Sequence, residues 1–161
     1  MAIQATIKSN SKIISKKFKH LESKLPRIID KGLKQAGFQL LDIIRTKTQK
    51  GQDFRGRPFA PYSQGYLKQL TKEGKPTRVD LFNTGRMLGS LTPSSTVKPS
   101  GKNKVSLAFS NGQMRQRALF NQVLGKNKRE FFGFNSRTEK IISKQFNRFV
   151  EKEIRGMKLW A

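Results

Sequence analysis

Few residues in this 161-residue chain have the side-chain chemistry of a catalytic site. The chain has no cysteine and one histidine, His20, which lies in a lysine-rich segment beside Leu21. Without cysteine there is no thiol nucleophile and no thiolate metal ligand, and one imidazole cannot form a histidine metal cluster. A surface or boundary position is therefore the favoured interpretation of His20.

The acidic residues and the one glycine-lysine segment do not supply this chemistry either. The 10 Asp and Glu residues are scattered, and none forms a pair with the spacing of a general acid and base. Residues 73–77, EGKPT, lack the upstream glycine of a phosphate-binding loop, and Pro76 stands where that loop has a magnesium-binding Ser or Thr. We therefore predict that the chain is not an enzyme and uses no cofactor.

Positive charge is the strongest signal in the composition. The chain has 34 Lys and Arg against 10 Asp and Glu, a formal net charge of +24 that is spread along the sequence. Such a surface repels itself unless it meets nucleic acid, an anionic membrane or an acidic protein surface. No segment has the roughly 20 consecutive apolar residues of a membrane span, so no spanning helix is expected. A membrane surface is the least favoured of the three partners, and no membrane partner is predicted.

The first third of the sequence predicts a short strand and then a long amphipathic helix. Residues 3–7 alternate between apolar and polar side chains, which is typical of a strand. Apolar residues then recur at steps of three and four, which predicts a helix that ends near Gly51. Pro26 predicts either a kink near Lys24–Pro26 or two helices that meet there. The predicted apolar stripe consists of Phe18, Leu21, Leu25, Ile29, Leu33, Ala36, Leu40 and Ile43.

The middle of the sequence predicts loops with short elements between them. Residues 53–80 contain several prolines and glycines, which indicates a long ordered loop. Four short elements are expected: a helical piece near Tyr62–Leu70, a helix capped by Thr84, a β-hairpin from Val97 to Phe109, and a helix around Met114–Leu124.

Residues 128–142, KREFFGFNSRTEKII, place three phenylalanines around one glycine before the last predicted helix. Ser136 and Glu139 have the spacing of a capping box, so this helix should begin at Ser136. Gly133 is expected to let the backbone turn. Three rings are predicted to be structural anchors that dock the helix onto the sheet: Phe131, Phe132 and Phe134. The sequence thus predicts one α+β domain over residues 1–161, with a small, mostly antiparallel sheet packed against a long N-terminal helix and a C-terminal helix.

Three short motifs occur along the chain in a fixed order. A phenylalanine loop with Gly-x-Pro lies at Phe54–Phe59, a Leu-x-x-Thr-Gly-x-Met-x-x-Ser-Leu element at Leu81–Leu91, and an Arg-x-Phe-Phe-Gly element at Arg129–Ser136. This order resembles the phage virion morphogenesis proteins, the tail-completion or head–tail neck proteins of tailed bacteriophages. One element departs from the family pattern, because Asn121 stands where many members have histidine.

The resemblance implies a small α+β subunit that assembles into a ring, hexameric if it follows tail symmetry, at the junction between capsid and tail. It implies other phage neck, connector and tail proteins as partners, and non-specific contact with packaged DNA. The expected location is the virion, after assembly in the host cytoplasm. The alternative function is a stand-alone basic nucleic-acid-binding protein.

Two groups of side chains are predicted to make intermolecular contacts. Aromatic residues are enriched in interface cores, and the candidates for subunit or partner contacts are Phe38, Phe54, Phe59, Tyr62 and Tyr66. Cations on rigid helices suit DNA phosphates or acidic partners, and these candidates are Lys31, Lys34, Lys140, Lys144 and Arg148. The alternatives are that Phe54 and Phe59 cover the sheet edge and that the basic helix faces are solvated.

Overall fold

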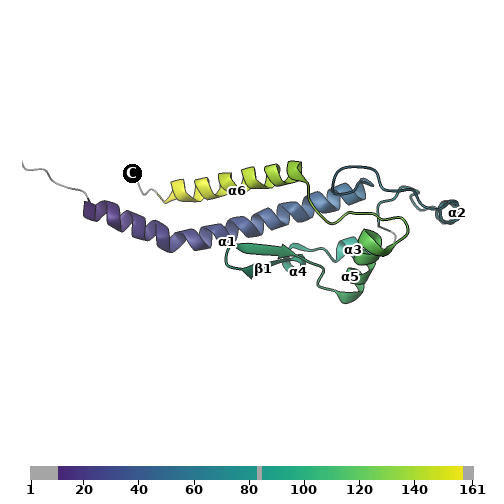
Figure 1. The fold of residues 1–161 in the computed structure, drawn as a ribbon, viewed down its shortest axis with the longest axis horizontal. Coiled ribbons are helices and arrows are strands. Elements are labelled where there is room, and N and C mark those ends of the chain that lie inside the picture. Colours follow the sequence, from purple (N-terminus) through teal and green to yellow (C-terminus); the bar gives the residue numbers. More distant parts are fainter. Residues whose placement is uncertain (1–10, 83–84, 158–161) are drawn as a thin grey trace, which may run out of the picture.

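The computed structural model describes residues 11–82 and 85–157 and confirms the α+β class (Figure 1). The strand predicted at residues 3–7 and the cap predicted at Thr84 lie outside the described residues. The elements are α1 (Ser11–Gln49), α2 (Gln64–Lys72), α3 (Arg86–Gly89), α4 (Pro93–Thr96), β1 (Val97–Gly101), β2 (Lys104–Leu107), α5 (Gly112–Leu119), the π-helix η1 (Phe120–Leu124) and α6 (Ser136–Gly156).

The long helix α1 is the axis on which the other elements pack. Figure 1 shows α6 running along one side of α1 in the opposite direction, with the β1–β2 hairpin on the other side. The antiparallel arrangement brings Lys47, near the end of α1, within 3.3 Å of Thr138 in the first turn of α6. The first turns of α1 extend past the C-terminal end of α6 (Figure 1).

Two glycines of α1 allow this close packing on both sides. A Cβ atom on Gly32 would lie 2.9 Å from Phe146 Cε2 of α6, and one on Gly37 would lie 2.6 Å from Val97 Cγ1 of β1. Neither position has room for a side chain at these distances. Glycine lowers the intrinsic stability of a helix by about 1 kcal/mol. At these two positions it also allows close contact with the neighbouring elements.

The buried face of α1 differs in part from the predicted stripe. The fully buried apolar positions are Ile28, Leu41 and Ile44, while the predicted positions beside them, such as Leu40 and Ile43, are half-buried. Phe18 is exposed. The difference arises because α1 packs against elements on two sides, so its burial covers a wider arc than a single stripe.

Pro26 lies inside α1, which continues as one helix from Ser11 to Gln49. The predicted alternative of two separate helices is therefore wrong. Figure 1 shows a change of direction in the N-terminal half of α1, as expected where proline removes a backbone hydrogen bond. The predicted end near Gly51 is confirmed, since Gly51 has φ 76° and its N–H donates to Thr48 O at 2.9 Å.

The predicted hairpin is also confirmed. Strands β1 and β2 are antiparallel, with Val97 opposite Leu107 and Pro99 opposite Val105. The turn uses Asn103 at φ 56°, a conformation that asparagine adopts more readily than most residues. Val97, Val105 and Leu107 all face Gly37 of α1, so the apolar side of the hairpin lies on the long helix.

The apolar core lies beside the C-terminal half of α1. Leu41 and Ile44 of α1 contribute there, together with Leu88 of α3 and Phe131 from the segment before α6. The remaining buried core residues are Phe59, Val79, Met87, Leu91, Val97, Met114 and Ala118. All three sequence motifs therefore contribute side chains to one core.

Helix α6 begins at Ser136 as predicted, but its cap is Asn135. The Asn135 Oδ1 atom accepts a hydrogen bond from Thr138 N–H at 2.9 Å. Asparagine and serine are both good N-cap residues, so a sequence with both residues in succession does not decide between them. The predicted Ser136 cap is wrong by one residue.

Substituting Gly37 with alanine tests the close approach of the hairpin to α1. The added methyl group would lie 2.6 Å from Val97 Cγ1, and overpacking of this kind costs about 1–3 kcal/mol. We expect Gly37→Ala to lower the free energy of unfolding by that amount in chemical denaturation. The matched control is Gly65→Ala in α2, where nothing lies within 4 Å of the added atom. Both substitutions gain the higher helix propensity of alanine, so a Gly37→Ala protein as stable as the Gly65→Ala protein would contradict the packing described above.

Candidate functional site

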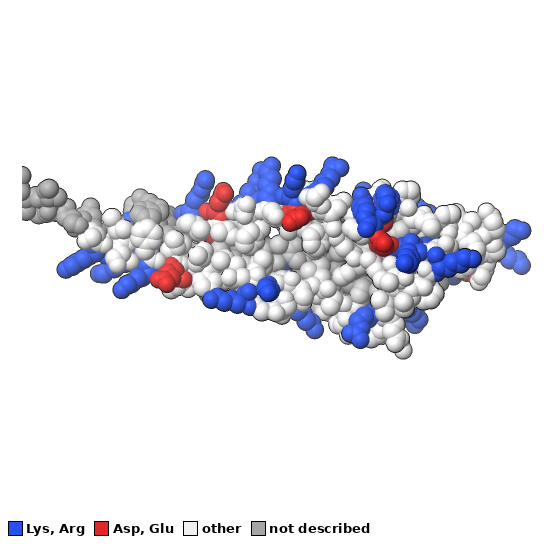
Figure 2. Space-filling model, viewed as in Figure 1, with Lys and Arg blue, Asp and Glu red and all other residues white. Residues whose placement is uncertain are grey.

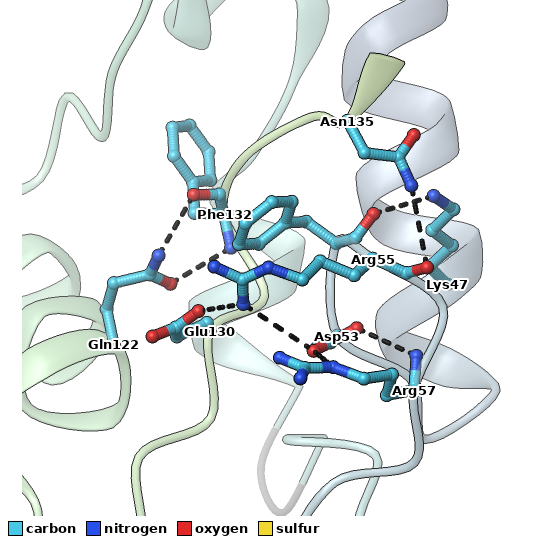
Figure 3. A network of polar contacts seen from close by, with 9 residues as sticks. Lys47, Asp53, Arg55, Arg57, Gln122, Glu130, Phe132 and Asn135 are labelled. Atoms are coloured by element: carbon cyan, nitrogen blue, oxygen red, sulfur yellow. Dashed lines mark hydrogen bonds and ion pairs between the residues drawn. The ribbon is translucent and has the colours of Figure 1, made fainter. Parts of the chain in front are cut away.

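The first and third sequence motifs meet between the end of α1 and the start of α6 (Figure 3). The backbone N–H of Phe54 donates to Glu130 O at 3.0 Å, and Asn135 Nδ2 donates to Arg55 O at 3.4 Å. The Phe54 ring lies over Gly133, where a Cβ atom would be 3.1 Å from Phe54 Cγ. We call this contact between residues 53–57 and 129–135 the motif junction.

A buried carboxylate organises the loop side of the motif junction. Asp53 accepts hydrogen bonds from Arg57 N–H at 2.8 Å and from Arg57 Nε at 3.0 Å. Arg55 lies 3.9 Å from Asp53 and pairs with Glu130 across the junction. Burial alone would raise the pKa of Asp53, but the hydrogen bonds and charge of Arg57 outweigh it and hold that pKa below its ordinary value. Asp53 is therefore ionised and fixes the loop.

Lys47 joins this loop to both long helices. Its Nζ atom donates to Phe54 O at 2.8 Å (Figure 3). It also donates to Thr138 Oγ1 at 3.3 Å. Sequence reasoning did not single out Lys47, because nothing in its spacing separates it from the other cations of α1. Its role depends on contacts between segments that are distant in the chain.

The three predicted anchors do not all have the same role. Phe131 is 1% exposed, and Phe132 is half-buried with its ring centre 5.4 Å from that of Phe109. Both rings therefore pack within the chain. Phe134 differs, because its side chain is 54% exposed. Gly133 was expected to let the backbone turn. It does not have positive φ, and its missing side chain leaves space for the Phe54 ring.

The predicted contact aromatics separate into internal and surface positions. Phe59 is buried in the core and Phe54 covers Gly133, so both pack within the chain. The predicted alternative placed them over the sheet edge, whereas Phe54 lies on the segment before α6. Phe38 is exposed on α1. Tyr62 and Tyr66 pack edge to face, with ring centres 4.9 Å apart.

Tyr62 and Tyr66 line a surface groove of about 480 Å³. Other residues of this groove are Leu81, Gly85, Met87, Arg117, Phe120 and Asn121. The guanidinium of Arg129 lies 5.1 Å from the Tyr62 ring centre, and burial together with the nearby Asp80 raises the pKa of Tyr62. Two of the five predicted contact aromatics are therefore brought together, beside residues of α5 and η1.

The sequence analysis missed an exposed apolar surface on α5 and η1. The helix predicted around Met114–Leu124 is divided into α5 and a π-helix. Its last turns expose four large apolar side chains: Leu119, Phe120, Val123 and Leu124. Their spacing, i, i+1, i+4 and i+5, is also that of a core-facing helix, so the sequence carried no signal that these residues would be exposed.

The predicted basic residues lie on three separate surfaces. Lys140, Lys144 and Arg148 are exposed on α6, and Figure 2 shows blue side chains along the edge that α6 forms. Lys31 lies beside Lys152 at the C-terminal end of α6. Lys34 faces the hairpin turn. The α6 cations are spaced by three or four residues, and we call this set the α6 row: Arg137, Lys140, Lys144, Arg148, Lys152 and Arg155.

The described part of the chain contains no group of three or more His, Asp and Glu residues that could hold a metal ion. None of the helices within residues 11–82 and 85–157 has the length and apolar character needed to cross a membrane. Comparisons with protein-family models, with curated proteins and with solved structures found no significant match.

Asp53→Asn tests the motif junction. The lowered pKa means that ionised Asp53 stabilises the fold above its ordinary pKa of 3.8, and that this stabilisation is lost as the pH falls through the lower folded value. At neutral pH we expect the substitution to lower the free energy of unfolding by about 1.5–3 kcal/mol. The difference from the native chain should shrink below pH 3.8 in denaturation measurements.

The control for this experiment is Glu73→Gln. Glu73 forms an exposed ion pair with Lys75 at 2.7 Å, and exposed pairs contribute little to stability. A destabilisation by Asp53→Asn that did not change with pH would contradict the assigned role of the Asp53 charge.

Proposed function

We propose that this chain is a structural subunit of the head–tail junction of a tailed phage, where it assembles into a ring that joins the tail to the capsid connector around the DNA path. The observation that carries this proposal is the motif junction. The motifs at Phe54–Phe59 and Arg129–Ser136 resemble recurring elements of the tail-completion proteins, and in this chain they bind each other directly. Motifs that determine a shared fold are expected to meet in this way.

The middle motif supports the same interpretation. Leu88 and Leu91 of Leu81–Leu91 are buried in the core with Phe131 of the third motif. Gly85 has φ 67°, and an added Cβ atom there would lie 3.0 Å from the Phe82 ring. Glycine at this motif position is therefore needed for the turn into α3. The resemblance thus rests on residues with defined structural roles in this chain.

The surface of the chain suits an assembly subunit. Exposed aromatic and apolar side chains lie at several places, among them Phe38 on α1 and Phe120 on η1. Contacts between different surfaces of identical subunits close into a ring when the rotation between neighbours permits it. In this assembly, the chain contacts copies of itself together with neck, connector and tail proteins.

The α6 row supports contact with packaged DNA. Its six cations lie on one exposed side of α6, which also carries Glu151. Cations held on a rigid helix can contact phosphates without reading base sequence, which suits DNA that must pass through a ring. The same row favours the second candidate function, a stand-alone basic nucleic-acid-binding protein.

Imaging separates these two functions. For the proposed function, we expect electron microscopy of the purified chain, alone or with its neck partners, to show rings, and antibody labelling to place it at the head–tail junction of phage particles. A monomer that coats nucleic acid and is missing from purified particles would overturn the proposal in favour of the stand-alone protein.

Charge reversal in the α6 row tests the contact with DNA. We expect the isolated chain to bind DNA weakly and without sequence preference, with log affinity falling against log salt by about 0.9 per phosphate contacted. The triple variant Lys140→Glu, Lys144→Glu, Arg148→Glu should reduce this slope in fluorescence anisotropy titrations. It should also lower the yield of infectious particles while the fold is retained.

The matched control reverses three exposed cations of the hairpin, Lys98, Lys102 and Lys104. This control has the same change in net charge but leaves the α6 row intact. Equal loss of slope in both variants would show that total charge, not the α6 row, determines binding. Binding that is insensitive to salt and selective for sequence would contradict the DNA-path role.

A further inference from the structure

The last turns of the helix formed by α5 and η1 expose a continuous apolar surface, which we call the η1 ridge: Leu119, Phe120, Val123 and Leu124. Phe120 and Leu124 are 61% and 65% exposed, the two highest values among the exposed large apolar residues of the described chain. Scattered single apolar residues are normal on a protein surface, whereas a contiguous group marks an interaction site.

The side of η1 that faces the protein is polar. Gln122 pairs with the backbone of Phe132, donating from Nε2 to Phe132 O at 3.0 Å and accepting from Phe132 N–H at Oε1 at 3.0 Å (Figure 3). The carbonyl of Asn121 accepts from Arg129 N–H at 2.7 Å. These bonds fix η1 against the motif junction with its polar residues inward and its apolar residues outward.

The helix that begins with α5 ends in a π turn. The N–H of Gly125 donates to Phe120 O at 2.7 Å, an i to i+5 bond, and a single π turn inserts one extra residue into a helix. Met114 and Ala118 of α5 still face the core. Val123 and Leu124 follow Ala118 by five and six residues, about 140° and 240° around a regular helix, so both are directed away from that core. Such π turns are found frequently at functional sites.

Positive charge flanks the η1 ridge along the sequence. Residues 111–128 contain four cations and no Asp or Glu: Arg115, Arg117, Lys126 and Lys128. All four are exposed. Arg117 and Phe120 also line the groove formed by Tyr62 and Tyr66, where Asp80 is the acid that acts on Tyr62. Phe120 thus joins the ridge to the groove, and Arg117 borders the groove beside it.

These cations decide what the surface can bind. A second copy placed ridge to ridge would bring two sets of these cations together, and like charges across an interface cost several kcal/mol. The exposed Ile13 and Ile14 in α1 of a second copy are no better suited to cover the ridge, because the cations Lys12 and Lys16 flank them. An acidic apolar segment would cover the ridge and neutralise the cations that flank it.

We propose that the η1 ridge and the adjoining groove form the docking site for an acidic, amphipathic helical segment of a different protein. The inference deepens the proposed function and rests on it, because it gives the chemical character of one neighbour in the assembly. The contacts between copies of this chain in the ring then lie on other surfaces.

A pair of peptides tests this site on the isolated full-length chain. One fluorescent amphipathic peptide carries leucine on one face and glutamate on the other, and the second replaces every glutamate with lysine. We expect the acidic peptide to bind and the basic peptide to bind much more weakly. Phe120→Ser with Leu124→Ser should weaken the acidic complex by about tenfold or more, because exposed apolar anchors dominate such contacts.

Two controls keep the test specific. Ile141→Ser removes a comparably exposed apolar residue from α6, where Ile141 is 43% exposed, and should leave peptide affinity unchanged. Arg117→Glu with Lys126→Glu keeps the apolar ridge intact and should weaken the acidic peptide while strengthening the basic one. Circular dichroism should show that each variant keeps its helical content.

Three results would overturn the inference. The acidic peptide could bind the Phe120→Ser, Leu124→Ser variant as tightly as the native chain, or both peptides could bind equally. Alternatively, sedimentation could show self-association that the same double variant abolishes, which would assign the ridge to a second copy. If the peptide experiment fails, the chain could still form rings and be labelled in phage particles, so the proposed function would stand. If the chain is absent from particles, the proposed function is overturned even if the acidic peptide binds.

Discussion

The close approach of two elements to α1 is the constraint on which the rest of the structure depends. Gly32 admits the Phe146 and Phe149 rings of α6, and Gly37 admits the side chains of the hairpin. At about 100° per residue, the five-residue separation directs these two positions about 140° apart around the helix. One helix can therefore carry α6 and the hairpin on different sides. A side chain at either glycine would move a whole element outward and with it every contact that element makes.

The motif junction follows from this arrangement. Because α6 lies antiparallel to α1, its first turn is held beside the last turns of α1, where Lys47 donates to both Phe54 O and Thr138 Oγ1. The loop after α1 and the segment before α6 then have to pack against each other. Asp53, Arg57 and the contact of Phe54 with Gly133 fix how they do so. Gln122 extends the same junction to η1 and determines which of its sides is exposed.

Local patterns in the sequence were sufficient to predict the long helix, the hairpin and the last helix, but not which elements pack against each other. The long helix, the hairpin from Val97 and the last helix could be predicted because periodicity, turn residues and caps act within a few residues. The burial of Ile28 and Leu41 beside the predicted stripe could not be predicted in this way, because it depends on a second element that packs against α1. Phe131 and Phe134 illustrate the same limit, since both are phenylalanines beside one glycine and only tertiary contacts bury the first. The η1 ridge is exposed because Met114 and Ala118 take the buried side of the same helix, and the local pattern does not decide which side is buried.

The distribution of charge links assembly to the binding of anions. The ion pairs found among the described residues lie in two places. At the motif junction, Arg55 and Arg57 pair with Asp53, and Arg55 also pairs with Glu130. In the other place, Lys75 pairs with Glu73. The α6 row is not part of either group. A chain of net charge +24 repels its own copies, and closing a ring brings those charges nearer together. Any anion that binds the ring better than the free subunit, whether DNA phosphate or an acidic neighbour, therefore stabilises the ring by mass action. If the chain forms the proposed ring, its basic surface makes ring formation depend on the partners that the ring is there to join.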